Sequence, residues 1–188
     1  GSGLGLVNAS NITLGAAGQV GQGLLGQAGG RSFVNASTGN LILQFGDERL
    51  SGKGIDLAAL RTYNAMGGVT DGDGDGWRWD GEASVMLTSG SLGQPGSTVS
   101  RTTGDGHVAV YSWNAANSRY ESFEGAGAVD TLKYASGEWT WTDGSSQTVE
   151  KYDSSGKIQS RADAIGNLII FGYSGNKLTS IKDNASGQ

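Results

Sequence analysis

The sequence of 188 residues contains no cysteine, one proline (Pro95) and one histidine (His107). The lack of cysteine excludes disulfide cross-links and thiolate metal sites. A single proline excludes a proline-rich linker. The sequence also lacks an apolar run of about 18 residues and the apolar core of a signal peptide. We therefore expect no membrane insertion.

Basic residues are also scarce. Lysine and arginine together number 13 against 18 acidic residues, giving a net charge of −5 and a pI near 4.8. No basic patch or stripe is visible in the sequence, so we expect no nucleic-acid partner. Acidic residues among glycines are instead typical of calcium-binding loops.

Glycine is abundant, with 34 residues, and the aromatic residues comprise five Trp, six Tyr and four Phe. Short strands joined by glycine-dependent turns produce such a composition. A disordered chain is the competing interpretation, but the aromatic residues and the regular alternation beyond the first 30 residues argue against it. The composition predicts an all-β protein.

Alternation of apolar and polar residues predicts the individual strands. Leu41, Leu43 and Phe45 are expected on the buried face of one strand, and the segment Trp77–Leu87 is expected to form one long strand. Residues 89–104 are rich in Ser, Gly and Thr, which predicts an exposed loop. The following segments read as hairpins with arms at 107–113 and 118–123, 129–134 and 138–142, 147–152 and 157–161, and 168–173 and 177–181. The predicted fold is an antiparallel meander of successive β-hairpins that forms a curved sheet.

The composition also predicts how the chain is divided. We expect residues 1–32 to be a weakly ordered Gly-rich leader with one short strand, Asn11–Leu14, and residues 33–188 to be a single β domain. Within that domain we distinguish an N-terminal segment with an Asp-Gly loop (33–88), hairpins (107–150) and a repeat region (151–188). Residues 1–3, Gly-Ser-Gly, also read as a cloning remnant.

The repeat region contains one short pattern twice. Tyr152 recurs as Tyr173, 156–158 (Gly-Lys-Ile) as 176–178 (Asn-Lys-Leu), and Asp163 as Asp183, at offsets of 20 or 21 residues. A period in this range indicates repeated supersecondary units that bury their apolar faces against neighbours. Each unit reads as a β-hairpin.

These units resemble the YD repeats of the RHS family, whose unit reads Y-D-x-x-G-R-L-x-x-x-x-D-x-x-G-N. Tyr152-Asp153, Gly156-Lys157-Ile158, Asp163 and Gly166-Asn167 match it, whereas the second unit has Ser174 in place of the family's Asp. Upstream, Thr38-Gly39-Asn40-Leu41, Ile55-Asp56-Leu57 with Arg61-Thr62-Tyr63-Asn64, and Gly76-Trp77-Arg78 are similar to the N-terminal segment of RHS proteins.

The resemblance implies a β-ribbon that spirals into a hollow shell, which in relatives encloses a toxin or effector. We therefore expect a non-enzymatic structural shell or scaffold segment of a large bacterial RHS/YD-repeat protein, secreted or on the cell surface, whose partner is the rest of the parent chain. The alternative is a peptide- or glycan-binding module of a bacterial adhesin. The chain is expected not to be an enzyme, and no catalytic residue is assigned.

The strongest candidate site is a loop of alternating aspartates and glycines. Asp71, Asp73 and Asp75 aim carboxylates at one position, and oxygen ligands of this kind suit Ca²⁺. With the carbonyl of Trp77 they predict a calcium site without EF-hand helices. Glu82 occupies the position of the EF-hand's bidentate glutamate, but an extended strand would hold it about 23 Å from Asp75. Whether Glu82 contributes stays open.

Other candidates are weaker. His107 lies near Asp105 without a placed nucleophile and is expected to be structural. Two of the three carboxylates Glu121, Glu124 and Asp130 would be needed as a pair for glycoside hydrolysis, although solvated turn positions explain them more simply. The Trp pairs 77/79 and 139/141 read as core residues, and either pair would form a platform for a sugar ring if its face proved exposed.

Overall fold

The computed structural model describes residues 9–14, 30–35, 39–50, 57–66, 75–104, 106–122 and 129–184. These residues separate into two compact units, one built on a five-stranded sheet and the other on a ten-stranded sheet. The described part contains strands, turns and a 3₁₀ turn, but no α-helix. It therefore contains no helix of the length and apolar character that a membrane span requires.

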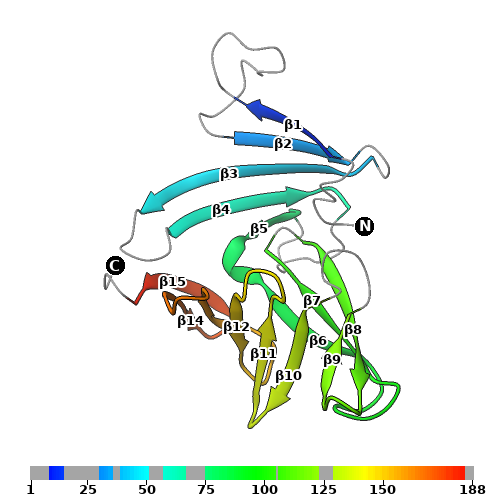
Figure 1. The fold of residues 1–188 in the computed structure, drawn as a ribbon. Coiled ribbons are helices and arrows are strands. Elements are labelled where there is room, and N and C mark those ends of the chain that lie inside the picture. Colours follow the sequence, from blue (N-terminus) through cyan, green and yellow to red (C-terminus); the bar gives the residue numbers. More distant parts are fainter. Residues whose placement is uncertain are drawn as a thin grey trace. The chain divides into compact units, whose positions relative to one another are not determined.

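The five-stranded sheet has the order β1-β2-β3-β4-β5 (Figure 1). Its strands are β1 (Ala9–Leu14), β2 (Gly30–Asn35), β3 (Leu41–Leu50), β4 (Leu57–Asn64) and β5 (Trp77–Trp79). The registers of β1 with β2, β2 with β3 and β4 with β5 are antiparallel. The predicted strand Asn11–Leu14 lies within β1. The predicted domain boundaries themselves stay a prediction.

The ten-stranded sheet follows chain order from β15 back to β6, which confirms the predicted antiparallel meander. Its strands are β6 (Ser84–Ser89), β7 (Thr98–Thr102), β8 (Val108–Asn114), β9 (Arg119–Glu121), β10 (Thr131–Ala135), β11 (Glu138–Thr142), β12 (Val149–Tyr152), β13 (Ile158–Ala162), β14 (Leu168–Ser174) and β15 (Lys177–Asp183). All four predicted hairpins are present.

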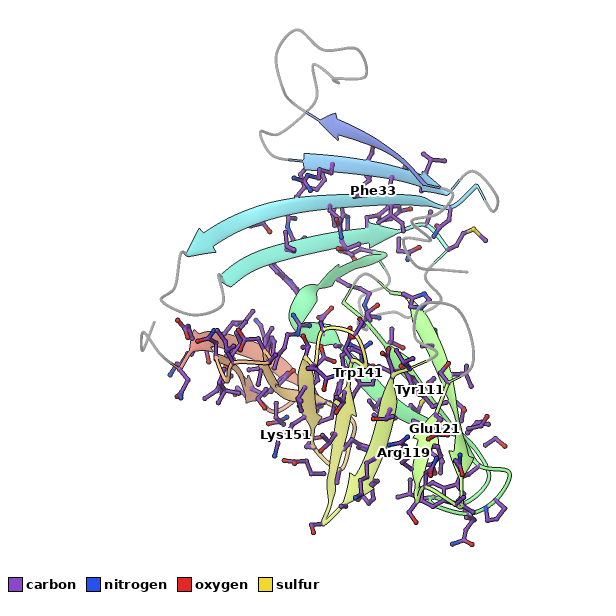
Figure 2. The ribbon with its side chains drawn as sticks, viewed as in Figure 1. Phe33, Tyr111, Arg119, Glu121, Trp141 and Lys151 are labelled. Atoms are coloured by element: carbon purple, nitrogen blue, oxygen red, sulfur yellow. The ribbon has the colours of Figure 1, made fainter. Side chains whose placement is uncertain are left out.

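One face of the ten-stranded sheet forms the core. Alternate residues of successive strands point to this face, because strand side chains alternate with a period of two. The buried cluster comprises Ala83, Val85, Val99, Tyr111, Tyr120, Leu132, Trp139, Trp141, Tyr152, Ile158, Ile169 and Phe171. Lys151, between the buried Glu150 and Tyr152, is exposed on the opposite face and pairs with Glu138 at 2.8 Å (Figure 2). The sheet therefore has a dry face and a wet face.

The sheet curls until its first strand meets the β12–β13 turn. Ser84 forms an isolated bridge with Lys157, and the backbone N–H of Val85 donates to the carbonyl of Gly156 at 2.9 Å. A side chain at Gly156, which has φ of 85°, would overlap the carbonyl oxygen of Val85. Glycine is needed here both for its conformation and for the close approach of the two backbones.

The predicted long strand Trp77–Leu87 is wrong. The 3₁₀ turn η2 (Asp80–Glu82) interrupts it, and β5 and β6 belong to different sheets. A Cβ at Gly81 would lie 2.6 Å from Leu178 Cδ2, so the chain bends where its backbone packs against the core. The alternation of apolar residues continues across this bend, which is why the sequence pattern did not reveal it.

The predicted buried face of β3 is also wrong. Ile42 is fully buried, whereas Leu41 is 36% exposed. The register places Ile42 opposite the buried Phe33 and Leu41 opposite the exposed Val34. Both faces of this strand carry apolar residues, so the sequence alone did not determine which one is covered.

The segment predicted as an exposed loop, residues 89–104, contains strand β7. Its side chains are nearly all buried, including Val99 at 0% and Arg101 at 7% exposure. Ser and Thr favour turns through local hydrogen bonds, but a strand with both faces covered accepts them. The predicted loop is therefore reduced to the turn between β6 and β7 and the two residues that follow β7.

The two repeats share an irregularity. Between β12 and β13 the partner of Lys151 is Ser160 and that of Tyr152 is Ile158, so Gln159 is the extra residue of a bulge. Between β14 and β15 the same shift at Tyr173 makes Thr179 the extra residue. Bulges bend and twist a strand at a defined position. The sequence repeat thus corresponds to a repeated bend of the sheet.

Candidate functional site

The predicted calcium loop lies mostly outside the described residues, which include Asp75 and Trp77 but not Asp71 or Asp73. Asp75 is exposed, and its Oδ1 accepts a hydrogen bond from the backbone N–H of Trp77 at 2.7 Å. Within the described ranges, no three His, Cys, Asp or Glu side chains are grouped to hold a metal ion. Asp75 therefore organises the turn into β5, and the calcium site stays a prediction.

The most organised polar cluster lies on the dry face of the ten-stranded sheet. Arg101 of β7 donates from Nη2 and Nε to Oε2 of Glu150, at 2.6 and 3.0 Å. Arg101 Nε also lies 2.9 Å from the Tyr152 hydroxyl, which itself donates to Glu150 Oε2. Arg161 of β13 donates to Oε1 of Glu150 at 2.9 Å. Two guanidinium groups and a phenol thus converge on one carboxylate.

Aromatic rings surround this cluster. The Arg101 guanidinium lies 3.6 Å from the centroid of Trp141, close enough for a cation–π contact. Trp141 Nε1 donates to the hydroxyl of Tyr111 at 2.9 Å, and the two side chains approach each other from β11 and β8 (Figure 2). Glu150 is 2% exposed and Tyr152 fully buried. The sheet therefore encloses the cluster except at Arg161, whose side chain is 24% exposed. We call it the interior charge network (Tyr111, Arg101, Trp141, Glu150, Tyr152, Arg161).

The electrostatics of the network hold its groups in one protonation state. Burial alone would raise the pKa of Glu150, but the charges of Arg101 and Arg161 lower this pKa below its usual value. Burial and the Glu150 charge raise the pKa of Tyr152. Burial opposes the charge of Arg101, yet Glu150 raises the pKa of that guanidinium overall. Glu150 stays ionised and Tyr152 stays protonated near neutral pH. The network therefore keeps the same charges and hydrogen bonds in this range.

Part of this network was predictable from local patterns. Glu150 and Tyr152 are two residues apart in a predicted strand, which places both on one face. The burial of Arg101 was not predictable in this way, because residue 101 lies in the segment predicted as an exposed loop. Its contact with Glu150 joins residues 49 positions apart and depends on the curl of the sheet.

Turn aspartates form a second recurring feature. Asp143, Asp153 and Asp163 each accept hydrogen bonds from backbone N–H groups two to four residues later in the chain. The Ser145 hydroxyl lowers the pKa of Asp143, and the Asn167 side chain lowers that of Asp163. Desolvation opposes the ionised form of Asp153, but Ser155 and Lys157 lower its pKa overall. These carboxylates hold the tight turns in shape.

The weaker candidates have separate partners. Glu121 accepts hydrogen bonds from Arg119, Asn114 and Asn117, which lower its pKa, and Arg119 lies beside it on β9 (Figure 2). Asp130 accepts from the N–H of Gly144 at 3.0 Å, and burial raises its pKa. Glu124 lies outside the described residues.

His107, the remaining weak candidate, is exposed. Its backbone carbonyl accepts a hydrogen bond from the N–H of Thr103 at 2.9 Å, which closes the turn before β8. Its predicted neighbour Asp105 lies outside the described residues. The structure thus gives His107 a backbone role at this turn, and no catalytic role is assigned to it.

The two Trp pairs have different environments. Trp139 and Trp141 are buried core residues, 4% and 6% exposed, as predicted. Trp79 in the five-stranded sheet is 38% exposed, and Trp77 is half-buried. Arg61 lies 5.4 Å from the Trp77 ring and 5.9 Å from the Trp79 ring. The core prediction is therefore wrong for Trp79, because Arg78 occupies the buried face of β5.

Comparison with known proteins finds partial similarity to curated relatives. No protein-family profile matches the chain. A stretch of 57 residues, 30% of this chain and 2% of the relative, is 39% identical to the tRNA nuclease WapA of Bacillus subtilis (strain 168). The tRNA(Glu)-specific nuclease WapA of Bacillus subtilis subsp. natto (strain BEST195) matches with the same identity and coverage. The chain thus spans a small fraction of the length of the curated relatives that it matches.

This similarity corrects one prediction. The sequence led us to expect a protein that is not an enzyme, and the matched relatives are both named as nucleases. That expectation rested on the lack of a placed catalytic nucleophile, and the acidic composition led us to expect no nucleic-acid partner. Neither property bears on a larger protein of which the matched stretch forms a small part.

Proposed function

We propose that the chain is a β-sheet scaffold segment of a large bacterial nuclease that acts on tRNA. The similarity to the two WapA nucleases supports the nuclease part of this proposal. The resemblance of residues 151–188 to YD repeats supports the scaffold part. The scaffold is secreted or lies on the cell surface, and calcium binding by Asp71, Asp73 and Asp75 stiffens its N-terminal segment.

The observation that carries the scaffold proposal is the repeated hairpin. Hairpins β12–β13 and β14–β15 extend one sheet and carry the same bulge next to Tyr152 and Tyr173. A sheet that adds one bent hairpin per repeat grows into a curved wall whose stability comes from contacts between neighbours. Strand β15 is an edge strand of this sheet and so offers backbone groups for a further strand.

The interior charge network gives the wall its curvature. Arg101 connects β7 to β12 across the dry face, and Gly156 meets Val85 at the point where the sheet closes on itself. A buried ion pair adds little net stability, but an arrangement that separated Arg101 from Glu150 would leave both charges buried without a partner. A scaffold with a defined curvature needs this specificity.

A repeat-extension experiment tests the scaffold. A second copy of residues 164–183 is joined directly after Asp183, and unfolding in urea is measured together with amide exchange. We expect one transition with a larger m-value, because more surface becomes buried, and slow exchange in the added strands. A shuffled copy of the same 20 residues is the control. Free exchange in the true copy would contradict growth by repeats.

Incubation with tRNA tests the nuclease part. The full-length protein that contains this chain is expected to cleave tRNA, and the products are resolved on a denaturing gel. A folded full-length protein that leaves tRNA intact would contradict the nuclease assignment while leaving the scaffold result unaffected.

A further inference from the structure

We propose that one face of the five-stranded sheet, formed by Phe45, Arg61, Tyr63, Trp77 and Trp79, binds a neutral oligosaccharide. We call this surface the aromatic face. The inference is independent of the scaffold role, because it concerns the five-stranded unit alone.

The antiparallel register brings the aromatic face together. Arg61 pairs with Trp79 and Tyr63 with Trp77, so the four side chains stand on the same side of β4 and β5. The Trp77 ring lies 5.7 Å from Phe45 of β3 and 5.6 Å from Tyr63, both in tilted arrangements. Three aromatic rings thus support one another beside the more exposed Trp79.

The aromatic face is accessible, in contrast to the opposite face of the same strands. Trp79 is 38% exposed, whereas Thr62 and Arg78, which point the other way, are 2% and 5% exposed. Trp79 therefore presents its indole ring to solvent beside three half-buried rings. The negative π face of an indole attracts the C–H groups on the apolar side of a pyranose ring.

An ion pair between Arg61 and Asp47, which we call the polar fork, lies beside the rings. Arg61 donates to both oxygens of Asp47, through Nε to Oδ2 and through Nη2 to Oδ1 at 2.7 Å. The side chains of Arg61 and Asp47 are 36% and 31% exposed. Arginine has five N–H donors and a carboxylate about four acceptor positions, so the pair retains capacity for a ligand. Neighbouring sugar hydroxyls, which both donate and accept, complement such a fork.

The charge of the fork selects among ligand classes. Asp47 neutralises Arg61, and the chain carries a net charge of −5, so a polyanion is repelled rather than attracted. An apolar protein surface would bury the ion pair without supplying hydrogen bonds, which costs free energy. A neutral ligand rich in hydroxyl groups satisfies both the rings and the fork.

Binding is tested with the full chain and neutral hexasaccharides of glucose and of N-acetylglucosamine, by titration calorimetry and tryptophan fluorescence. We expect at least one neutral hexasaccharide to bind and to change the fluorescence. Trp79→Ala should weaken this binding about tenfold or more, and Asp47→Asn should also weaken it, with the melting temperature of each variant nearly unchanged. Ile165→Ala, an exposed apolar position on the other unit, is the matched control and should bind as the unaltered chain does.

Three results would overturn the proposal. The first is no binding of any neutral hexasaccharide to the folded chain. The second is equal affinity in the Trp79→Ala variant, which would place the ligand elsewhere, such as the groove of about 290 Å³ lined by Val85, Leu87, Tyr134 and Trp139. The third is binding of heparin in preference to neutral sugars.

Discussion

At the scale of single residues, Glu150 has the largest share of the interior interactions. Its carboxylate receives hydrogen bonds from Arg101, Arg161 and Tyr152 while only 2% of the residue is exposed. A buried charge with such partners contributes little net stability to the fold. Removing it is nevertheless destabilising, because the partner charges then stay buried without a counter-charge. Replacing Glu150 alone should therefore lower the stability more than replacing Glu150 together with Arg101.

Glu150→Leu is expected to destabilise the chain by about 3–5 kcal/mol, because it leaves the buried Arg101 without its counter-charge. The double variant Glu150→Leu/Arg101→Met should recover much of this loss. Urea unfolding of both variants measures the difference. Strictly additive effects of the two substitutions would show that the contact between Arg101 and Glu150 is energetically unimportant.

The pH dependence of stability follows from the lowered pKa of Glu150. A carboxyl group whose pKa falls on folding contributes stability above its unfolded value of 4.5, and this contribution is lost as the pH falls through the lower folded value. Asp143, Asp153 and Asp163 act in the same direction. The unfolding free energy should therefore stay level from pH 7 to about 5 and fall in more acidic solution.

Denaturant titrations between pH 3 and 7 measure this profile. Asp163→Asn, at an exposed turn, should flatten the acid limb without unfolding the chain. An identical acid limb in the variant would mean that Asp163 does not contribute to it.

At the scale of elements, the hairpins were predictable because their signals are local. The turn Ala135–Glu138 has positive φ at Ser136 and Gly137, the conformation that a two-residue hairpin favours. The longer turns at Asp153 and Asp163 are held by the Asp side chain and end in glycine. The turn between β14 and β15 has only two residues, Gly175 and Asn176, with a positive φ of 59° at Gly175.

Gly156→Ala is expected to lower the free energy of unfolding by about 1–3 kcal/mol or more. The new Cβ would meet the carbonyl of Val85, and φ of 85° is unfavourable for alanine. Gly166→Ala is the matched control, since it also has positive φ but open space around its Cβ. Thermal melts of both variants separate the steric effect from the conformational one. Equal losses would show that the contact with Val85 is unimportant.

Asp153→Ala is expected to cost about 1–2 kcal/mol, because the turn loses its bonds to Ser155 and Lys157. Asp153→Asn keeps an acceptor at the same position and should lose less. Hydrogen exchange at the N–H groups of Ser155 and Lys157 gives a local readout. Unchanged protection in the alanine variant would contradict the role of the side chain.

At the scale of the whole molecule, the two units have different functions in our proposals. The ten-stranded unit forms the repeated scaffold, and the five-stranded unit carries the aromatic face. The aspartate loop precedes β5 in the sequence, so calcium bound by its carboxylates would lie close along the chain to Trp77. Metal binding to the native state raises stability by mass action.

Calcium at millimolar concentration is expected to raise the melting temperature of the chain by several degrees. Asp73→Ala should abolish this increase, whereas magnesium should have a weaker effect because it favours stricter octahedral geometry. Differential scanning calorimetry with and without chelator measures the shift. The same melting temperature with and without calcium would remove calcium from the proposal.

The sequence alone determined the all-β class, the order of the hairpins and the position of the repeat. These depend on side-chain alternation and turn residues, which act over a few positions. Tertiary structure decided which face of β3 is covered, where the chain bends at Gly81 and that Arg101 meets Glu150. Each of these depends on contacts between residues distant in the chain, and local patterns do not encode the path that brings such residues together.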